Sequence, residues 1–384
     1  MSGDRTDRGA AGCGTGVHGR GSAGGPAGTG ATPNPQQVLS RQRAQVRRLK
    51  LVRGLALVLG ACLTLGLMVF SLTLGSAQIP LSRILAAVLQ PLQLEAFSVD
   101  SRTETIVWVL RMPRIAVAAL AGAILGMGGC VTQAILKNPL ATPYTLGVSA
   151  GAGFGAALGL IFGVAFLPGT LAIVANAFLF ALIPAAVIIA VSGRTHFTPE
   201  TTILLGVGMS YVFAAANTLL QFFAESDALR AAVFWLVGDL TRASMTQVPV
   251  LAAVFGAFLL VNMAFARDLT IIKMGDEDAK GMGVDVKRLR FVALLVTCLA
   301  TAAVISFTGT IGFIGLLAPH IARLVIGSDE RVLVPASALL GACLLLTADI
   351  VAKTVVAPVL LPVGAVTALL GGPLLIYLLL RRRA

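Results

Sequence analysis

The sequence predicts an all-α polytopic membrane protein with about ten transmembrane helices, a short helix at the outer interface and a disordered N-terminal tail. Hydrophobic residues make up 57% of the 384 residues and charged residues 12%, about half the charged fraction of a soluble domain. Apolar runs of about 20 residues recur from Leu51 onward, and each can cross a hydrocarbon core of about 30 Å. None shows the short alternating pattern of a membrane barrel, so helices are expected.

The N-terminal region differs from the rest of the chain. Residues Met1 to Pro35 are rich in Gly, Ala and Ser without apolar periodicity, which predicts disorder. A basic tail that binds nucleic acid is an alternative, but no aromatic residues interleave the charges. We therefore divide the chain into a cytoplasmic tail, 1–50, and a transmembrane domain, 51–384. The positive-inside bias places in the cytoplasm a basic cluster of Arg41, Arg43, Arg47, Arg48, Lys50 and Arg53.

Ten crossings are predicted from the apolar runs, and the eighth is short, interrupted by Gly315 and Pro319. With the N-terminus inside, most Lys and Arg residues fall on the inner side, including Arg194, 267–290 and the C-terminal arginines 381–383. This orientation places both termini in the cytoplasm. The predicted crossings are 54–74, 115–135, 144–166, 171–192, 201–222, 246–266, 291–311, 312–326, 332–355 and 362–380.

Two polar segments interrupt this pattern. Residues 229–239 are too short to span the membrane and have polar ends, which predicts a short helix at the outer interface with Trp235 as its anchor. A plain surface loop is the alternative. Residues 267–290 form the longest internal polar segment, in which acids open a short helix at Asp276 and Gly281 and Gly283 break it. We expect this segment to dock on a soluble partner, the alternative being a solvated loop.

Charged residues also occur near the ends of apolar runs. Arg111 and Arg114 flank a proline at the start of a predicted crossing, where charges must stay at the aqueous edge or meet a partner. This arrangement indicates an outer rim that receives an acidic docking surface. Asp349 and Lys353 lie four residues apart near the outer end of the ninth crossing. They form either a structural pair, which the spacing favours, or a site where Lys353 faces an acidic partner.

Motifs of several other function classes are absent. The sequence contains no G-x-x-x-x-G-K-[ST] phosphate loop, no G-x-S-x-G elbow and no H-E-x-x-H motif. Its five cysteines and three histidines have no paired metal-ligand spacing. The chain is therefore not expected to hydrolyse ATP, catalyse a reaction or hold a metal. A secondary transporter would need intramembrane ionisable residues as relays, and only Asp349 qualifies. A membrane-embedded enzyme is disfavoured by the missing catalytic residues.

Nine motifs between Leu51 and the C-terminus, in this order, carry a family resemblance. They are RMPR (111–114), QAILKNPLATP (133–143), LGVS (146–149), FWLVG (234–238), GDEDAKGMG (275–283), GFIGLLAPH (312–320), RVLVP (331–335), ADIVA (348–352) and PVG (362–364). The chain resembles the FecCD-type permeases, which are the transmembrane subunits of ABC importers for iron-siderophore complexes, haem and vitamin B12. Such a series is far more specific than any single motif.

The resemblance implies a multi-pass protein of the bacterial cytoplasmic membrane with ten spanning helices per subunit. It implies a second permease subunit, identical or different, with the translocation path between the two. Two ATPase subunits would dock below and a periplasmic or lipid-anchored substrate-binding protein above. No cofactor is expected on the permease, since ATP is used by the ATPase subunits. A ferric siderophore is the expected cargo, with haem or cobalamin as the alternative, carried by alternating access without metal–protein bonds.

The same resemblance assigns roles to particular residues, and two motifs depart from the family. The family commonly has an acid before its Pro-[VI]-Gly motif where this chain has Leu360-Leu361, and it has Asp-His-Arg where this chain has Asp329-Glu330-Arg331. Carried over residue by residue, the roles are binding-protein docking for Arg111, Arg114 and Lys353, ATPase coupling for Gly275, Asp276, Glu277, Ala279 and Gly283, and the translocation gate for Asn138, Leu140, Thr201 and Trp235.

Overall fold

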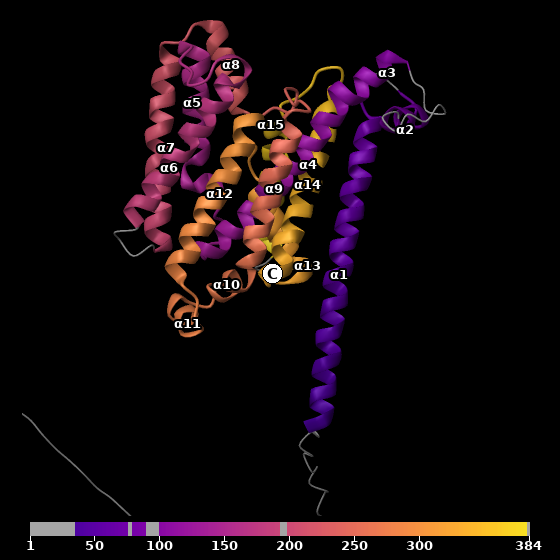
Figure 1. Cartoon of the computed structure of the whole chain (residues 1–384), viewed down its shortest axis with the longest axis vertical. Helices are drawn as coiled ribbons and strands as arrows, with labels where there is room; N and C mark the ends of the chain where they lie inside the picture. The colour runs from indigo at the N-terminus through magenta and orange to yellow at the C-terminus, as the bar shows by residue number, and fades with distance from the viewer. Residues whose placement is uncertain (1–34, 76–78, 90–99, 193–197, 382–384) are drawn as a thin grey trace, which may run out of the picture. The chain divides into compact units, whose positions relative to one another are not determined.

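The computed structural model describes residues 35–75, 79–89, 100–192 and 198–381, and these residues form helices and connecting segments without β-strands (Figure 1). The predicted disorder of residues 1–34, the loop at Arg194 and the last arginines, 382–383, lie outside the described residues. The helices are α1 Pro35–Thr73, α2 Leu81–Leu89, α3 Ser101–Thr105, α4 Met112–Ile135, α5 Val148–Phe162, α6 Ala172–Ser192, α7 Pro199–Phe222, α8 Ser226–Leu236, α9 Gln247–Ala264, α10 Ala266–Ile271, α11 Asp276–Gly281, α12 Val286–Thr308, α13 Ile314–Ile326, α14 Glu330–Thr354 and α15 Val363–Arg381.

Each predicted crossing coincides with one of these helices, but not all of them are long enough to span a bilayer. Seven helices in the described part of the chain are long and apolar enough to cross a membrane. Helices α5, α13 and α15 have shorter apolar stretches, in α13 only 13 residues against the roughly 20 that a crossing requires. The structure therefore supports an all-helical membrane fold and does not by itself establish ten crossings.

The chain divides into two units, Met1–Leu49 and Lys50–Ala384. The described part of the first unit is the beginning of α1, which starts at Pro35. Residues 35–50, which the sequence analysis places in the N-terminal tail, are therefore helical. Arg, Lys, Gln, Ala and Leu dominate this stretch, and they have favourable helix propensities even where the segment is too polar for a membrane.

Helix α4 lies at the centre of the second unit, among α9, α12, α13 and α14 (Figure 1). A π-helical turn, Ile106–Arg111, leads into it without a break. In the spanning window of Ser101–Ile135, 83% of the residues are buried, whereas the windows of α1 and α7 are only 11% buried. The exposed leucines and aromatic residues of α1 and α7 therefore form an apolar surface suited to lipid or to a second subunit.

Small residues allow α4 to approach its neighbours closely. A Cβ added to Gly129 would lie 1.7 Å from the carbonyl oxygen of Gly315 in α13, and one added to Gly126 would lie 2.2 Å from that of Ser337 in α14. Gly122 makes an equally close approach to Gly341. Helices in lipid lack a hydrophobic driving force between them, so close backbone packing at small residues is a main source of their association.

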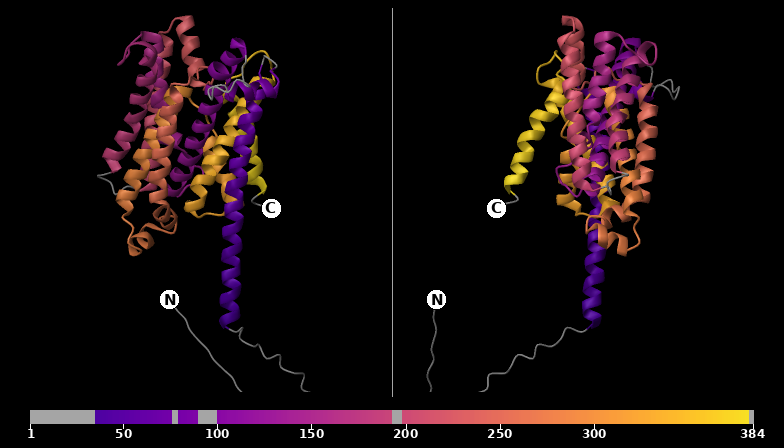
Figure 2. Two further views of the ribbon diagram at one scale, coloured as in Figure 1. Left: turned by 45° about the vertical axis from the view of Figure 1, so that its right-hand side comes forward. Right: turned by 90° about the vertical axis from the view of Figure 1, so that its left-hand side faces the viewer.

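Helices α5, α6 and α7 pack together, and α12 contacts both α6 and α4, which connects this group to the centre. Figure 2 shows α15 leaning away from the other helices toward its C-terminal end. Leu369 and Ile376 on this helix are 75% and 61% exposed. Their exposure leaves an apolar face for lipid or another subunit.

The two polar segments fold as short helices. Helix α8 confirms a helix in place of a surface loop, but Trp235 is 6% exposed, whereas Phe234 beside it is 55% exposed. The expectation that Trp235 anchors the helix at the interface is wrong, because its ring faces the core and Phe234 is the outward aromatic. In the other segment, α11 ends at Gly281, and Gly283 follows in the left-handed region at φ +82°, as the sequence predicts.

Candidate functional site

Asp276 is the centre of a charged cluster at the end of the second unit where α10 and α11 lie, which we call the hairpin end. Its carboxylate accepts two hydrogen bonds from Arg290 of α12, at 2.8 and 2.9 Å. A third hydrogen bond, from Lys137 in the turn after α4, measures 2.6 Å. Arg290 is only 3% exposed, so its charge depends on this carboxylate for compensation. Asp276 thus links α11 to both α12 and the end of α4.

The pKa of the Asp276 carboxyl reports the same contacts. Burial disfavours its charged form, but hydrogen bonds from Lys137 and Arg290 outweigh burial and lower the pKa below its ordinary value. The carboxylate is therefore ionised at neutral pH. An ionised Asp276 keeps the connection between the three segments intact.

The turn after α4, residues 136–142, carries two of the predicted gate residues. Lys137 has a positive φ of 48°, and the Asn138 side chain accepts a hydrogen bond from the backbone N–H of Leu140 at 2.9 Å. Leu140 is 52% exposed. Because Lys137 is bound to Asp276, the structure joins a predicted coupling residue to the segment that holds Asn138 and Leu140. Their role as a gate stays a prediction.

The other predicted coupling residues shape α11. Gly275 precedes the helix at φ +154°, a conformation that favours glycine. Ala279 is fully buried and anchors α11 against the core. Glu277 projects outward and pairs with Lys280 at 2.8 Å, and both side chains are largely exposed. Open space surrounds Gly283. The buried side of α11 is therefore fixed to the protein while its acidic side is free for a partner.

A second charged cluster at the hairpin end was not predicted. Glu330, the first residue of α14, is fully buried, and its carboxylate accepts hydrogen bonds from Lys273 at 2.7 Å and from Cys130 at 2.9 Å. Its backbone N–H donates to Thr270 Oγ1 of α10. The acid that replaces the family's histidine is thus compensated by a lysine of the α10–α11 segment. Lys273 and Glu330 are 57 residues apart in sequence, so no local sequence pattern predicts this pair.

The remaining gate candidates lie in other parts of the bundle. Thr201 is in the first turn of α7, where its N–H and hydroxyl contact the capping hydroxyl of Thr198. Trp235 is in α8. Among the described residues no side-chain hydrogen bond joins either residue to the turn after α4, and α8 lies at the end of the bundle opposite α11 (Figure 1).

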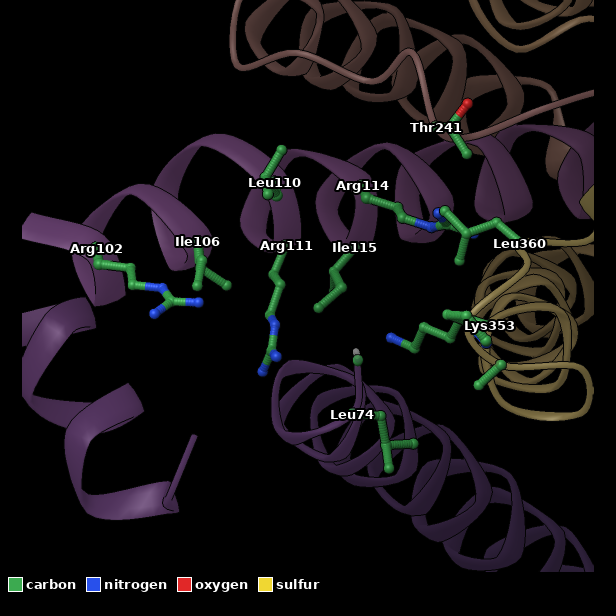
Figure 3. A pocket seen from close by; sticks show the side chains of 13 residues that line it. Leu74, Arg102, Ile106, Leu110, Arg111, Arg114, Ile115, Thr241, Lys353 and Leu360 are labelled. Carbon is green, nitrogen blue, oxygen red and sulfur yellow. The ribbon is translucent and has the colours of Figure 1, made fainter. Parts of the chain in front are cut away.

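At the opposite end, the three predicted docking cations surround one cavity of about 420 Å³ (Figure 3). Arg111 and Lys353 point into the space between α4, α14 and the end of α1, and Arg102 of α3 lies on the same lining. The three residues therefore lie together, with Arg102, which was not predicted, beside them, and their docking role stays a prediction.

These cations do not project from the surface as an open rim, which corrects that expectation. Arg111 is 8% exposed and donates to the carbonyl of Leu72 at the end of α1. Arg114 pairs with the buried Asp349 at 2.7 Å. Lys353 donates to the Ser71 carbonyl and hydroxyl at 2.8 and 2.6 Å. Charges at a membrane edge are costly without partners, and here the end of α1 and Asp349 of α14 supply them.

The contacts of Asp349 also bear on the two readings of the pair with Lys353. The two charged groups lie 3.7 Å apart, and both side chains are less than a tenth exposed. This geometry favours the structural reading, in which each charge compensates the other.

Comparison with known proteins gives a consistent result. The model of the FecCD transport family matches residues 63–381. A hemin transport system permease, HmuU of Yersinia pestis, is 36% identical, with 72% of this chain and 84% of the relative covered. A cobalamin import permease, BtuC of Halobacterium salinarum, is 38% identical over 79% of this chain and 80% of the relative.

Two further comparisons extend this range. The iron(3+)-hydroxamate import permease FhuB of Bacillus subtilis is 34% identical over 82% of this chain and 79% of the relative. A solved structure described as a metal-chelate type ABC transporter in an inward-facing conformation has a TM-score of 0.74 and 26% identity, covering 85% of this chain and 98% of that one. The similarity therefore extends over most of the transmembrane domain in both sequence and fold.

Proposed function

Because the chain belongs to the FecCD transport family, we propose that it is the transmembrane subunit of an importer that carries a ferric-siderophore complex. The chain itself is a non-catalytic ABC importer permease. Its energy source is a separate ATPase subunit, and no cofactor is bound by the permease. A second permease subunit completes the path, in a multi-pass arrangement in the cytoplasmic membrane with both termini in the cytoplasm.

Among the steps of transport, coupling to the ATPase has the most support from the geometry. That support comes from the hydrogen bonds of Asp276. A partner bound to the acidic outer side of α11 moves Asp276, and its hydrogen bonds transmit this movement to Arg290 and Lys137. Arg290 belongs to α12, and Lys137 precedes Asn138 and Leu140. Movement of α11 would thus reach a spanning helix and the proposed gate through two charged contacts. Such discrete contacts suit switching between two packings.

Docking of a substrate-binding protein is assigned to the opposite end. An acidic side chain that enters the 420 Å³ cavity would face Arg102, Arg111, Arg114 and Lys353, with Asp349 as the nearby carboxylate. The local balance is cationic, which would steer and orient an acidic partner. We therefore propose that the partner reaches the predicted docking residues inside the cavity, and not at an open rim.

The cargo is proposed from the relatives. Permeases for iron(3+)-hydroxamate and Fe(3+)-citrate of Bacillus subtilis are 34% and 36% identical to this chain. The hemin and cobalamin permeases are equally similar, so haem or cobalamin is the second candidate. All of these are bulky ligands that a binding protein can deliver whole.

Uptake by the reconstituted importer tests this proposal. The chain would be placed in proteoliposomes with its ATPase and binding protein, and ATP-driven uptake of a ferric hydroxamate, haem and cobalamin would be compared. We expect saturable uptake of the ferric siderophore alone. Uptake of only haem or cobalamin would overturn the cargo and leave the importer intact. Uptake of none of the three, with a loaded binding protein that docks, would contradict the proposed class of cargo.

A further inference from the structure

A second cavity, of about 320 Å³, opens at the hairpin end and has no role in the function proposed above. Its walls come from three separate parts of the chain. Gln133 and Lys137 lie at the end of α4, Lys273 precedes α11, and Arg323 lies near the end of α13. Three of these four residues are cationic. The cavity is thus a convergence of positive charge next to the segment that we assign to coupling.

The two lysines of this cavity are already compensated by carboxylates. Lys137 donates to Asp276, and Lys273 donates to Glu330 and to the carbonyl of Ser328. These ion pairs hold both ammonium groups at the cavity wall. They also connect the cavity to α11 on one side and to α14 on the other.

Arg323 and Gln133 are compensated differently. The guanidinium of Arg323 donates to the amide oxygen of Gln133 at 2.9 Å, a neutral acceptor. Gln133 is 4% exposed, and its amide nitrogen has no acceptor among the described residues. A buried donor without an acceptor is unfavourable, as is a guanidinium without a counter-charge. In the part of the chain that the structure describes, the cavity therefore offers N–H donors and one positive charge without a carboxylate partner, which is the chemistry that binds an anionic oxygen ligand.

We infer that this cavity receives a carboxylate side chain, an aspartate or glutamate, from the surface of the ATPase subunit. The inference rests on the proposed function and adds an acidic contact separate from α11. One carboxylate oxygen would accept from Arg323 and the amide of Gln133, and the other would face the lysines. Lys137, Lys273 and Arg323 give the cavity wall itself a positive charge, which favours an acidic group on the partner. Because Lys137 and Lys273 are bonded to Asp276 and Glu330, the occupant would bias both charged clusters at once.

Two variants of the cavity test this inference. Arg323→Gln removes the uncompensated charge. Gln133→Glu places a carboxylate beside Arg323 from within the chain, so that the charge of Arg323 is already compensated. Arg331→Gln is the control, since it removes an exposed cation at the same end outside the cavity. The measurement is the Kd for the ATPase subunit that supports uptake with this chain, in nanodiscs, at low and high salt, with the thermal unfolding of each variant recorded.

We expect both cavity variants to weaken ATPase binding about tenfold at low salt, with a shallower salt dependence, and the control to change it less than about twofold. Wild-type affinity in Gln133→Glu and Arg323→Gln would overturn the inference. A raised KM for the anionic chelate with unchanged ATPase affinity would also overturn it and assign the cavity to cargo. If no ATPase subunit supports uptake with the wild-type chain, the proposed function fails first, and that result is distinguishable from the other two.

Discussion

Replacing Lys137 by methionine should uncouple ATP hydrolysis from transport without removing the ATPase. Lys137 joins α11 to the proposed gate through one hydrogen bond of 2.6 Å to Asp276. The two side chains are 29% and 33% exposed, so the pair is partly screened by water. Ion pairs of this kind contribute up to about 1 kcal/mol, and a loss of this size corresponds to roughly a fivefold change in an equilibrium constant.

The assay is the amount of cargo transported per ATP hydrolysed in proteoliposomes that contain the complete importer. Lys137→Met should lower this ratio about fivefold while hydrolysis continues. Lys280→Met is the matched control, because Lys280 belongs to the same segment but pairs only at the surface, where the side chains are 59% and 87% exposed. A wild-type ratio in Lys137→Met, or an equal fall in the control, would refute the reasoning.

Asp276→Asn extends the same test and should have the larger effect. It removes the negative charge and one of the two acceptor oxygens, and so weakens the contacts with Lys137 and with the buried Arg290 together. Hydrogen bonds to charged groups contribute about 1.5–3 kcal/mol, so transport should fall well beyond the level of Lys137→Met. If Arg290 contributes nothing to coupling, the two variants should have the same transport ratio.

Three further predictions concern packing, buried charge and pH. Gly129→Ala should prevent correct folding, measured as the monodisperse fraction in detergent, since its Cβ would lie 1.7 Å from a backbone oxygen, whereas Gly54→Ala meets open space and should be tolerated. Arg114→Gln should cost up to about 3–5 kcal/mol because it removes the closer cation of the buried Asp349 and leaves only Lys353 at 3.7 Å, and adding Asp349→Asn should recover much of the lost thermal stability. The pKa of Asp276 is lowered, so its stabilising contribution should be complete above about pH 4 and lost as the pH falls through the folded pKa.

Each of these predictions has a contradicting outcome. A monodisperse Gly129→Ala protein with wild-type stability would show that α4 and α13 are not in close contact. A double variant of Arg114 and Asp349 no more stable than Arg114→Gln would show that the buried carboxylate is not what destabilises the single variant. A stability difference between wild type and Asp276→Asn that persists unchanged well below pH 4 would contradict the lowered pKa.

The helices of this chain could be predicted from sequence because the bilayer sets their length and composition. The predicted crossing 115–135 corresponds to α4, Met112–Ile135, and every other crossing overlaps a helix, although α5 has only 15 residues where 144–166 was predicted. The start of α1 was missed for the same reason. Residues 35–50 are polar and charged, so an apolar-run criterion excludes them although their helix propensity is high.

The contacts between charged residues could not be predicted in the same way. Resemblance pointed to Asp276, but its partners Lys137 and Arg290 are 139 and 14 residues away in sequence. Glu330 was recognised as a departure from the family, while its compensation by Lys273 depends on how α10 approaches α14. Long-range ion pairs have no local periodicity, so only the fold identifies them.

The surroundings of the docking cations Arg111, Arg114 and Lys353 could not be predicted from the sequence either. All three line the cavity at one end of the bundle, Arg111 and Arg114 where α4 begins and Lys353 where α14 ends. Their burial depends on the end of α1, where Ser71 and Leu72 supply acceptors to Lys353 and Arg111. A sequence pattern places a charge along a helix but does not say which neighbouring backbone will cover it.

The dependence of transport on a separate ATPase tests the central claim most directly. The measurement is the initial rate of cargo uptake into liposomes that contain this permease and its loaded binding protein, with wild-type ATPase, with a hydrolysis-deficient ATPase and with none. The account predicts sustained uptake only with the wild-type ATPase and ATP. Full-rate uptake by the permease in the absence of ATPase and nucleotide would contradict it.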